Sequence, residues 1–315
     1  MKGVILDADS LGNINLEPII NCFDSCDVHP TTADHEISQR IAPANVVLSN
    51  KIQLDKSALN QAKNLQFISV MATGTNNIDL SAAANQGIQV SNARAYSTPS
   101  VVQHTINLML TLSTNLPNYL RDVKEGAWHK SNVFTMLHHP IIELSGKTLG
   151  IIGYGDLGSN VSVIAKAFGM DIKIAARNKG ESSANRLDLN TLLPSVDFLS
   201  LHCPLTESNA NLINSQTLSL MKPTAFLINT ARGGLVNSED LISALKNGLI
   251  AGAAIDVLNH EPPNLNDPLL KANLQNLLIT PHNAWGALES RERLVVQMKE
   301  NIECYKQGKP IRLVN

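Results

Sequence analysis

The sequence contains no run of apolar residues long enough to cross a membrane. No stretch approaches the roughly 20 consecutive apolar residues that a transmembrane helix requires. The N-terminal segment MKGVILDADS has an apolar run of only three residues, Val4 to Leu6, which Asp7 ends. We therefore expect no secretory signal peptide there and place the protein in the cytoplasm.

The chain also lacks a strong excess of charge of either sign. Its 315 residues include 25 Lys and Arg against 27 Asp and Glu, which gives a formal net charge of -2. This balance does not indicate a nucleic-acid partner or an anionic membrane surface. A small anionic metabolite needs only a local positive site, so it remains a candidate ligand.

Cysteines are few, and their spacing suits neither a metal site nor a disulfide framework. They are Cys22, Cys26, Cys203 and Cys304, with no CxxC pair. Cys22 and Cys26 are one helical turn apart, but no further ligands lie nearby in suitable order. His138 and His139 precede a proline in a loop-like stretch, and we expect both to be exposed. The sequence thus predicts reduced thiols and no bound metal.

What the chain does contain is an alternation of short β-rich runs with helix-like segments. Most of these runs are continuously apolar, which is typical of parallel strands covered on both faces. One of the helices starts at Ser238, a residue type that commonly caps helices. The expected strands are residues 3–7, 45–49, 66–71, 88–91, 148–153, 172–176, 198–203, 225–230, 252–257 and 277–280. The predicted class is α/β with doubly wound parallel sheets.

Two long helix-like segments divide the chain. One spans residues 101–116 and ends before a proline, and the other spans about residues 287–307 and ends before a glycine. They flank a glycine-rich motif. We therefore predict a substrate domain of residues 1–97 with 287–315, and an inserted dinucleotide-binding domain of residues 98–286.

The glycine-rich motif lies in the segment TLGIIGYGDLGSNVSVIAKAFGM. Gly153, Gly155 and Gly158 follow an apolar strand, open a helix and precede a second strand, as a dinucleotide fingerprint requires. Gly153 permits a tight turn, Gly155 lets a pyrophosphate approach the backbone, and Gly158 lets the helix pack on the strand. Backbone N–H groups at the start of the helix, at Asp156 and Leu157, would bind the phosphates.

The end of the second strand bears on the choice between NAD and NADP. An NAD site commonly has a carboxylate there that binds the ribose 2′-hydroxyl. This sequence has Ala176 and Arg177, followed by Lys179, so cations that can pair with a 2′-phosphate replace the carboxylate. We expect NAD or NADP as cofactor with NADPH favoured. Solvated surface cations are the alternative interpretation.

Three further stretches lie at the C-terminal ends of predicted strands. They are INTARGG around Arg232, AIDV leading to Glu261, and TPHNAW around His282. Ligands of open α/β sheets bind at that edge. An arginine, a glutamate and a histidine brought to one edge can perform acid–base chemistry on an anionic substrate.

Together with the fingerprint, these stretches resemble the D-isomer-specific 2-hydroxyacid dehydrogenase family over nearly the whole chain. The resemblance includes ATGTNNID, NARAYST, LSGKT and HCPLT. Within the family, His282 followed by Ala284 and Trp285 most resembles the glycerate dehydrogenase (hydroxypyruvate reductase) branch. The resemblance implies NAD(P)H-dependent reduction of a small 2-oxo acid to the D-2-hydroxy acid, with hydroxypyruvate as the expected substrate.

The types of the three catalytic candidates suit this reaction, and the resemblance assigns them the same roles. Arg232 offers a planar fork of donors that can hold the substrate carboxylate. Hydride attack on the carbonyl carbon builds negative charge on the oxygen, and a protonated His282 can donate its proton there. Glu261 would accept the other ring N–H and favour the imidazolium.

The resemblance also implies further contacts. Backbone N–H groups near Thr73 and Gly74 would bind the substrate carboxylate, and Trp285 would shape the substrate pocket or fill a domain interface. A symmetric homodimer is implied, and the apolar run over residues 101–112 supports it. Cofactor contacts beyond the fingerprint would be Thr230, Ala231, Asp256 and His282 at the nicotinamide end, and His202, Cys203, Pro204 and Thr206 along the cleft.

Two alternatives remain open. D-lactate, phosphoglycerate or glyoxylate could replace hydroxypyruvate; a phosphorylated substrate would need extra cations, and ATGTNNID supplies none, although Arg94 is close in sequence. Because the sequence ends at Asn315, soon after the last expected helix, we expect no regulatory extension of the kind that phosphoglycerate dehydrogenases often carry. Some relatives instead serve as nucleotide-sensing corepressors, which a turnover assay would distinguish.

Overall fold

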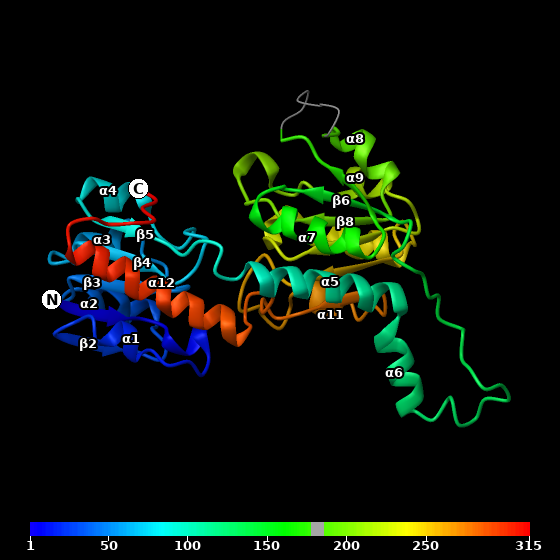
Figure 1. Cartoon of the computed structure of the whole chain (residues 1–315), viewed down its shortest axis with the longest axis horizontal. Coiled ribbons are helices and arrows are strands. Elements are labelled where there is room, and N and C mark those ends of the chain that lie inside the picture. Colours follow the sequence, from blue (N-terminus) through cyan, green and yellow to red (C-terminus); the bar gives the residue numbers. More distant parts are fainter. Residues whose placement is uncertain (178–185) are drawn as a thin grey trace. The chain divides into compact units, whose positions relative to one another are not determined.

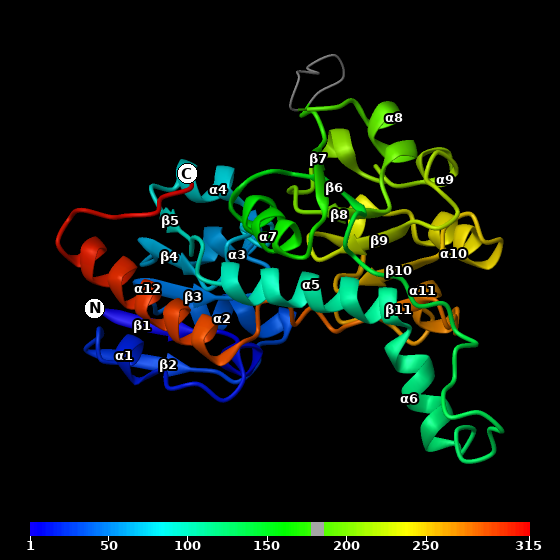
Figure 2. The ribbon, with the colours of Figure 1, turned by 45° about the vertical axis from the view of Figure 1, so that its right-hand side comes forward.

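The structure, a computed structural model, describes residues 1–177 and 186–315 (Figure 1). The chain divides into two compact units, Met1–Ser97 with Trp285–Asn315, and Thr98–Ala284. Each unit contains its own parallel sheet, and helices cover both faces of that sheet (Figure 2). The prediction of an α/β protein with two doubly wound sheets is therefore confirmed.

The first unit is built on a five-stranded parallel sheet in the order β2-β1-β3-β4-β5. Its strands are β1 (Lys2–Ile5), β2 (Ser25–Val28), β3 (Val46–Ser49), β4 (Phe67–Val70) and β5 (Gln89–Ser91). Its α-helices are α1 (Glu17–Ile20), α2 (Ile37–Ile41), α3 (Lys56–Gln61), α4 (Leu80–Asn85) and α12 (Leu288–Lys306). The two core clusters lie on opposite faces of the sheet, one beneath α2, α3 and α4 and the other beneath α1 and α12.

The second unit is built on a six-stranded parallel sheet in the order β11-β10-β9-β8-β6-β7. Its strands are β6 (Thr148–Ile152), β7 (Asp171–Ile174), β8 (Phe198–Leu201), β9 (Phe226–Asn229), β10 (Gly252–Ile255) and β11 (Leu277–Ile279). Its α-helices are α5 (Thr98–Thr114), α6 (Leu116–Lys124), α7 (Asp156–Ala167), α8 (Leu189–Leu192), α9 (Ser215–Ser219), α10 (Ser238–Lys246) and α11 (Pro268–Lys271). Helices α5 and α7 cover one face, and α8, α9 and α10 cover the other.

The order of strands in this sheet reverses at β6. The chain first adds β7 on one side of β6, and then adds β8 on the other side and continues outward to β11. In open parallel sheets, such a reversal leaves a crevice beyond the carboxyl ends of the two strands, and ligands bind there. The turns that leave β6 and β8 therefore border the crevice in which a cofactor is expected to bind.

All ten expected strands are present, and their ends lie within two residues of the expected positions. The sequence did not indicate β2, an edge strand whose side chains are mostly exposed. Such a strand needs no continuous apolar run, because only one of its edges pairs and its faces are partly open to solvent. Continuous apolar runs in the sequence therefore predicted the strands that are covered on both faces, and missed this edge strand.

Two expectations about helix ends are wrong. The helix expected over residues 101–116 ends at Thr114, and the proline that was expected to stop it lies in the first turn of α6 instead. Proline fits there because first-turn N–H groups have no partner within the helix. The cap of α10 is Asn237 rather than Ser238, because the Asn237 side chain accepts hydrogen bonds from the N–H groups of Glu239 and Asp240.

Two expectations about composition concern membranes and thiols. Within the described parts of the chain, no helix combines the length and the apolar character that a membrane crossing requires.

All four cysteines carry free thiols. Burial raises the pKa of the Cys22 and Cys203 thiols, and raises that of Cys26 to about 11, so these groups are poor nucleophiles near neutral pH.

Candidate active site

The glycine turn between β6 and α7 is packed too tightly for side chains at two of its three glycines. Gly153 has a φ of +94°, and a Cβ there would lie 2.5 Å from the backbone N of Cys203. A Cβ on Gly158 would lie 2.2 Å from the carbonyl oxygen of Gly153. These distances show that Gly153 lets the turn pack against the loop that leaves β8, and that Gly158 lets α7 pack against the turn.

No contact among the described residues requires the third glycine. A Cβ on Gly155 would meet no described atom within 4 Å, so the space above this residue is open. Gly155 is the N-cap of α7, and the first N–H groups of a helix have no intrahelical partners. The side-chain carboxylate of Asp156 accepts a hydrogen bond from the Thr98 hydroxyl. Open space at a helix N-terminus is what a pyrophosphate needs, so the turn fits the expected dinucleotide.

The end of β7 has no carboxylate among its described residues. The backbone N of Ala176 donates a hydrogen bond to the carbonyl of Leu187 over 2.7 Å, and Arg177 is exposed. Lys179, the second cation expected to pair with a 2′-phosphate on the ribose, lies outside the described residues. The described part of this strand end therefore offers a cation and no group that would repel a 2′-phosphate.

The loop after β8 lies beside the glycine turn and is rigidly held. Burial lowers the pKa of His202 to about 4, so its imidazole is neutral at physiological pH. Its Nε2 lies 2.9 Å from the Ser200 hydroxyl, while its buried Nδ1 has no hydrogen-bond partner among the described residues. Asn209, which the sequence did not single out, donates to the Pro204 carbonyl and accepts from the Thr206 N–H.

Glu261 and His282, which the sequence suggested as an acid–base pair, are in hydrogen-bonding contact in the loops after β10 and β11. His282 Nδ1 lies 2.5 Å from Glu261 Oε2, and the two side chains are 25% and 31% exposed. The other carboxylate oxygen of Glu261 accepts a hydrogen bond from the N–H of Leu258. Glu261 is thus fixed from both sides. Because Nδ1 is directed at Glu261, Nε2 is the ring nitrogen that can reach a substrate.

Asp256 holds the loop that carries His282. Its carboxylate is 1% exposed and accepts hydrogen bonds from the Thr280 hydroxyl at 2.6 Å and from the N–H groups of Asn283 and Ala284 at 3.1 Å each. Its backbone carbonyl accepts from the N–H of His282 at 2.7 Å. His282 itself has a φ of +51°, an uncommon conformation for a residue with a side chain, which these bonds maintain.

Asp256 has a further neighbour on α5 that the sequence did not indicate. His104 Nε2 lies 3.1 Å from the Thr280 hydroxyl and 3.6 Å from Asp256 Oδ1. The side chain of Thr105, the next residue of α5, lies 3.2 Å from the hydroxyl of Thr230 after β9. Helix α5 therefore supports the loops after β9 and β11 from one face of the sheet.

The loop of Arg232 contacts the loop of Glu261 through a glycine. A Cβ on Gly233 would lie 2.1 Å from the carbonyl carbon of Leu258, so only glycine allows the two loops to approach this closely. Buried Asn229 donates to the Arg232 carbonyl at 2.9 Å and accepts from the Ala231 N–H at 3.0 Å. Three consecutive strands, β9, β10 and β11, thus deliver Arg232, Glu261 and His282 to one edge of the sheet.

The expected substrate residues Thr73 and Gly74 belong to the first unit, in the loop after β4. The Asn92 side chain fixes this loop by donating to the Thr73 carbonyl at 2.7 Å. Asn301 on α12 is fully buried and in turn donates to the Asn92 carbonyl at 3.1 Å. Trp285 stands edge-on to Tyr96 with ring centroids 6.4 Å apart, and it packs on the core of the first unit.

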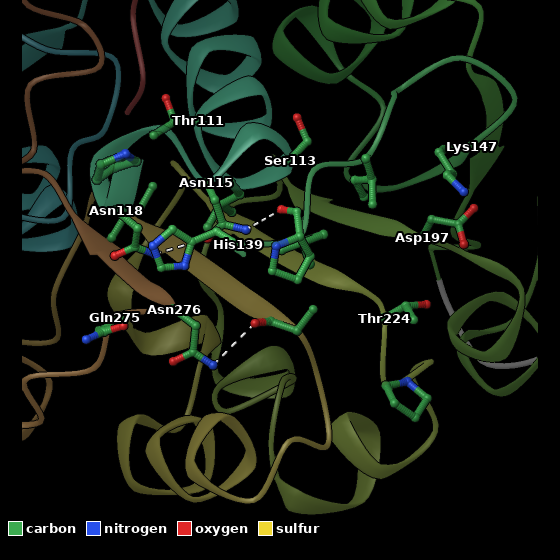
Figure 3. Close-up of a pocket in the computed structure, with 18 residues that line it drawn as sticks. Thr111, Ser113, Asn115, Asn118, His139, Lys147, Asp197, Thr224, Gln275 and Asn276 are labelled. Atoms are coloured by element: carbon green, nitrogen blue, oxygen red, sulfur yellow. Dashed lines mark hydrogen bonds between the residues drawn. The ribbon is translucent and has the colours of Figure 1, made fainter. Parts of the chain in front are cut away.

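A cavity of about 530 Å³ opens at the opposite edge of the six-stranded sheet (Figure 3). Residues at the amino ends of the strands line it, including Lys147, Asp197 and Asn276. Among the described residues, its lining includes none of the three catalytic candidates. Ligands of open parallel sheets bind at the carboxyl ends, so this cavity is not the expected cofactor site.

The glycine turn yields a test that separates ligand contact from packing. Gly155→Ala should leave the melting temperature unchanged, because the added methyl group meets no described atom within 4 Å. It should weaken dinucleotide binding by about 5- to 100-fold, since a clash of this kind costs roughly 1–3 kcal/mol. Gly158→Ala, the matched control, should lower the melting temperature. Thermal melts and NADPH fluorescence titrations measure both, and tight dinucleotide binding by Gly155→Ala would contradict the assignment.

Comparison with known proteins agrees with this geometry. Residues 106–284 match the D-isomer specific 2-hydroxyacid dehydrogenase NAD binding domain. The chain is 40% identical over 313 residues to glycerate dehydrogenase of Methylorubrum extorquens, covering 99% of this chain and 98% of that protein. It is 34% identical to hydroxypyruvate reductase of Blautia hydrogenotrophica over 100% of both chains. An acyclic imino acid reductase in complex with NADPH and D-Arg has the same fold, with a TM-score of 0.89 and 27% identity over 100% of both chains. The chain therefore belongs to the D-isomer specific 2-hydroxyacid dehydrogenase family and is an NAD(P)-dependent oxidoreductase.

Proposed function

We propose that this enzyme reduces hydroxypyruvate to D-glycerate. The observation that carries the proposal is the Glu261–His282 pair, which lies at the sheet edge that also receives Arg232. The similar proteins named glycerate dehydrogenase and hydroxypyruvate reductase support this choice of substrate. Reduction in this direction consumes one NAD(P)H and one proton for each 2-oxo acid and yields the 2-hydroxy acid and NAD(P)⁺.

The proposed mechanism assigns one task to each of the three side chains. Arg232 binds the substrate carboxylate through its planar guanidinium and so orients the neighbouring carbonyl. The bound dinucleotide supplies the hydride. Protonated His282 donates the proton on Nε2 to the carbonyl oxygen, while Glu261 holds Nδ1 and stabilises the positive charge of the ring. In the reverse direction His282 accepts the hydroxyl proton.

Other residues would position these groups or the ligands. Asp256 would act through the loop of His282, because its carboxylate is buried and occupied by hydrogen bonds from that loop. Backbone N–H groups at Thr73 and Gly74 are proposed to bind the substrate carboxylate. Trp285 is proposed to limit the size of the substrate side chain. The remaining proposed cofactor contacts are Leu157, Thr230, Ala231, His202, Cys203, Pro204 and Thr206.

Initial rates with a panel of 2-oxo acids test the proposed substrate. Hydroxypyruvate should give a higher kcat/KM than glyoxylate, pyruvate or phosphohydroxypyruvate, each assayed with NADH and with NADPH. Preference for pyruvate or phosphohydroxypyruvate would replace the proposed substrate while leaving the reaction class intact. Absence of turnover with every member would instead favour a nucleotide-sensing role.

In the same assay, variants of the three side chains should give different kinetic signatures. His282→Ala removes the proton donor and should lower kcat by about 10²–10⁴-fold, with cofactor binding retained. Arg232→Ala should lower kcat/KM by about 30-fold or more, since a desolvated charge contact is worth roughly 2–5 kcal/mol. A His282→Ala enzyme with near wild-type kcat would show that another group donates the proton.

Glu261→Gln should slow the same reaction. The substitution keeps the shape of the side chain but removes the negative charge that stabilises the imidazolium. Without that charge the imidazolium is less stabilised, so kcat for reduction should fall while dinucleotide binding, measured by fluorescence titration, persists.

We further propose that NADPH serves this enzyme at least as well as NADH. Ala176 leaves room for a 2′-phosphate and exposed Arg177 can pair with it. Ala176→Asp should therefore move the preference toward NADH, because the new carboxylate accepts the 2′-hydroxyl and repels the phosphate. The ratio of kcat/KM for the two cofactors measures the change. A wild type that strongly prefers NADH, unaffected by Arg177→Ala, would refute the proposal.

A symmetric homodimer is also proposed, but not through the surface that the sequence suggested. The apolar residues over 101–112 that motivated the idea are largely buried within their own unit, among them Val102, Ile106 and Met109. Large apolar side chains are exposed instead on α6 and the segment after it, where Leu120 is 60% exposed and Phe134 is 90% exposed. Patches of this kind commonly mark interfaces. Light scattering should give twice the chain mass of 34.0 kDa, and Leu120→Glu with Phe134→Glu should lower it.

A further inference from the structure

Two histidines contact an aspartate of α6, and the proposed reaction uses none of these three side chains. His138 Nε2 and His139 Nε2 each lie 2.7 Å from the same oxygen, Asp122 Oδ2. Asp122 belongs to α6, and the histidines belong to the segment that returns toward β6. The donor atoms of all three side chains lie within 4.8 Å of one another. The expectation that both histidines are simply exposed is wrong for His139, whose side chain is 19% exposed.

The chain holds this cluster in place through its backbone. The Tyr119 hydroxyl donates to the His139 carbonyl at 2.8 Å and accepts from the His139 N–H at 3.2 Å. The side chain of Asn115 donates to the carbonyl of Pro140 at 2.6 Å, and Figure 3 shows His139 beside Asn115. The ring of Tyr119 also stands edge-on to both imidazoles. The two histidines are therefore presented to Asp122 by several independent contacts.

The chemistry of the donor set matches a zinc ion. Imidazole nitrogens and a carboxylate oxygen are ordinary zinc ligands, with bond lengths of about 2.0–2.2 Å. Tetrahedral ligands at such lengths are about 3.3 Å apart, so each N···O separation needs to open by only about 0.6 Å. The other oxygen of Asp122 lies 3.8 Å from Arg121 Nε, the one cation paired with the cluster among the described residues, so the cation and the histidines occupy different oxygens.

Charge and access also suit a divalent cation. The hydrogen bonds from the two histidines lower the pKa of the Asp122 carboxyl, so the group is ionised at neutral pH. The side chain of His138 is 51% exposed, which gives an ion and a fourth, water ligand a route from solvent. An imidazole ring can carry a proton on Nδ1 while its Nε2 binds a metal.

We propose that Asp122, His138 and His139 form a zinc site that fastens the segment after α6 to that helix. The ion would be bound through Asp122 Oδ2 and the two Nε2 atoms, with water as the fourth ligand. The site is structural: it lies outside the Arg232, Glu261 and His282 group, and no step of the proposed reaction requires it. The proposal therefore holds or fails independently of the choice of substrate.

Titration of the metal-free full-length protein with Zn²⁺ by calorimetry tests the site. The wild type should bind one zinc ion per chain, and Co²⁺ at the same site should give the intense visible absorption of tetrahedral coordination. His138→Ala, His139→Ala and Asp122→Ala should each weaken binding by at least about 100-fold, because loss of even an outer partner of a metal ligand typically costs about 10–100-fold.

His129→Ala is the matched control, because His129 is an exposed histidine of the same segment and not part of the cluster. It should bind zinc as the wild type does. A wild type that binds no zinc at micromolar concentrations would overturn the proposal and leave the cluster as a hydrogen-bonded one. Zinc binding that persists in the Asp122 and His139 variants would also overturn it, since the ion would then sit elsewhere. Far-ultraviolet circular dichroism of each variant separates loss of the site from loss of folding.

Discussion

The buried carboxylate of Asp256 is the interaction on which the candidate active site depends. A charge that is 1% exposed is costly unless hydrogen bonds surround it, and here the donors come from Thr280, Asn283 and Ala284. These donors belong to the loop that carries His282. The path of that loop is therefore determined by the hydrogen bonds that the Asp256 carboxylate requires. Removing one partner of a buried charge commonly costs about 3–5 kcal/mol, which makes the arrangement stiff. A stiff loop is what a proton donor requires, because proton transfer depends on hydrogen-bond geometry.

Glycines make a second set of constraints at the same edge of the sheet. Gly153 lets the turn after β6 approach the loop after β8 more closely than a side chain would allow. Gly233 does the same for the loops after β9 and β10. Gly155 differs, because its missing side chain leaves space that none of the described atoms fills. The packing of the described residues thus accounts for Gly153 and Gly233, whereas the open space at Gly155 fits a ligand. This distinction gives the dinucleotide assignment a physical basis in the fold of this chain.

The segment between α6 and β6 is organised by different means. It has little core of its own, and Phe134 and Leu137 are largely exposed. Its order comes from polar contacts, in which Tyr119 and Asn115 hold the backbone and Asp122 holds the two histidines. A bound ion would suit such a segment, because a metal links distant parts of a chain where hydrophobic burial is small.

The sequence by itself determined the alternation of strands and helices, the glycine fingerprint and the identities of Arg232, Glu261 and His282. Continuous apolar runs and the residues that follow them are local patterns, so they can be recognised in the sequence without knowledge of the fold. Only the tertiary structure decided which distant residues meet, including His104 with Thr280, Asn209 with the loop after β8, and Asp122 with His138 and His139. The physical reason is that such contacts depend on strand order and loop path. A histidine 16 residues from an aspartate carries no mark in the sequence that the two will share a hydrogen bond.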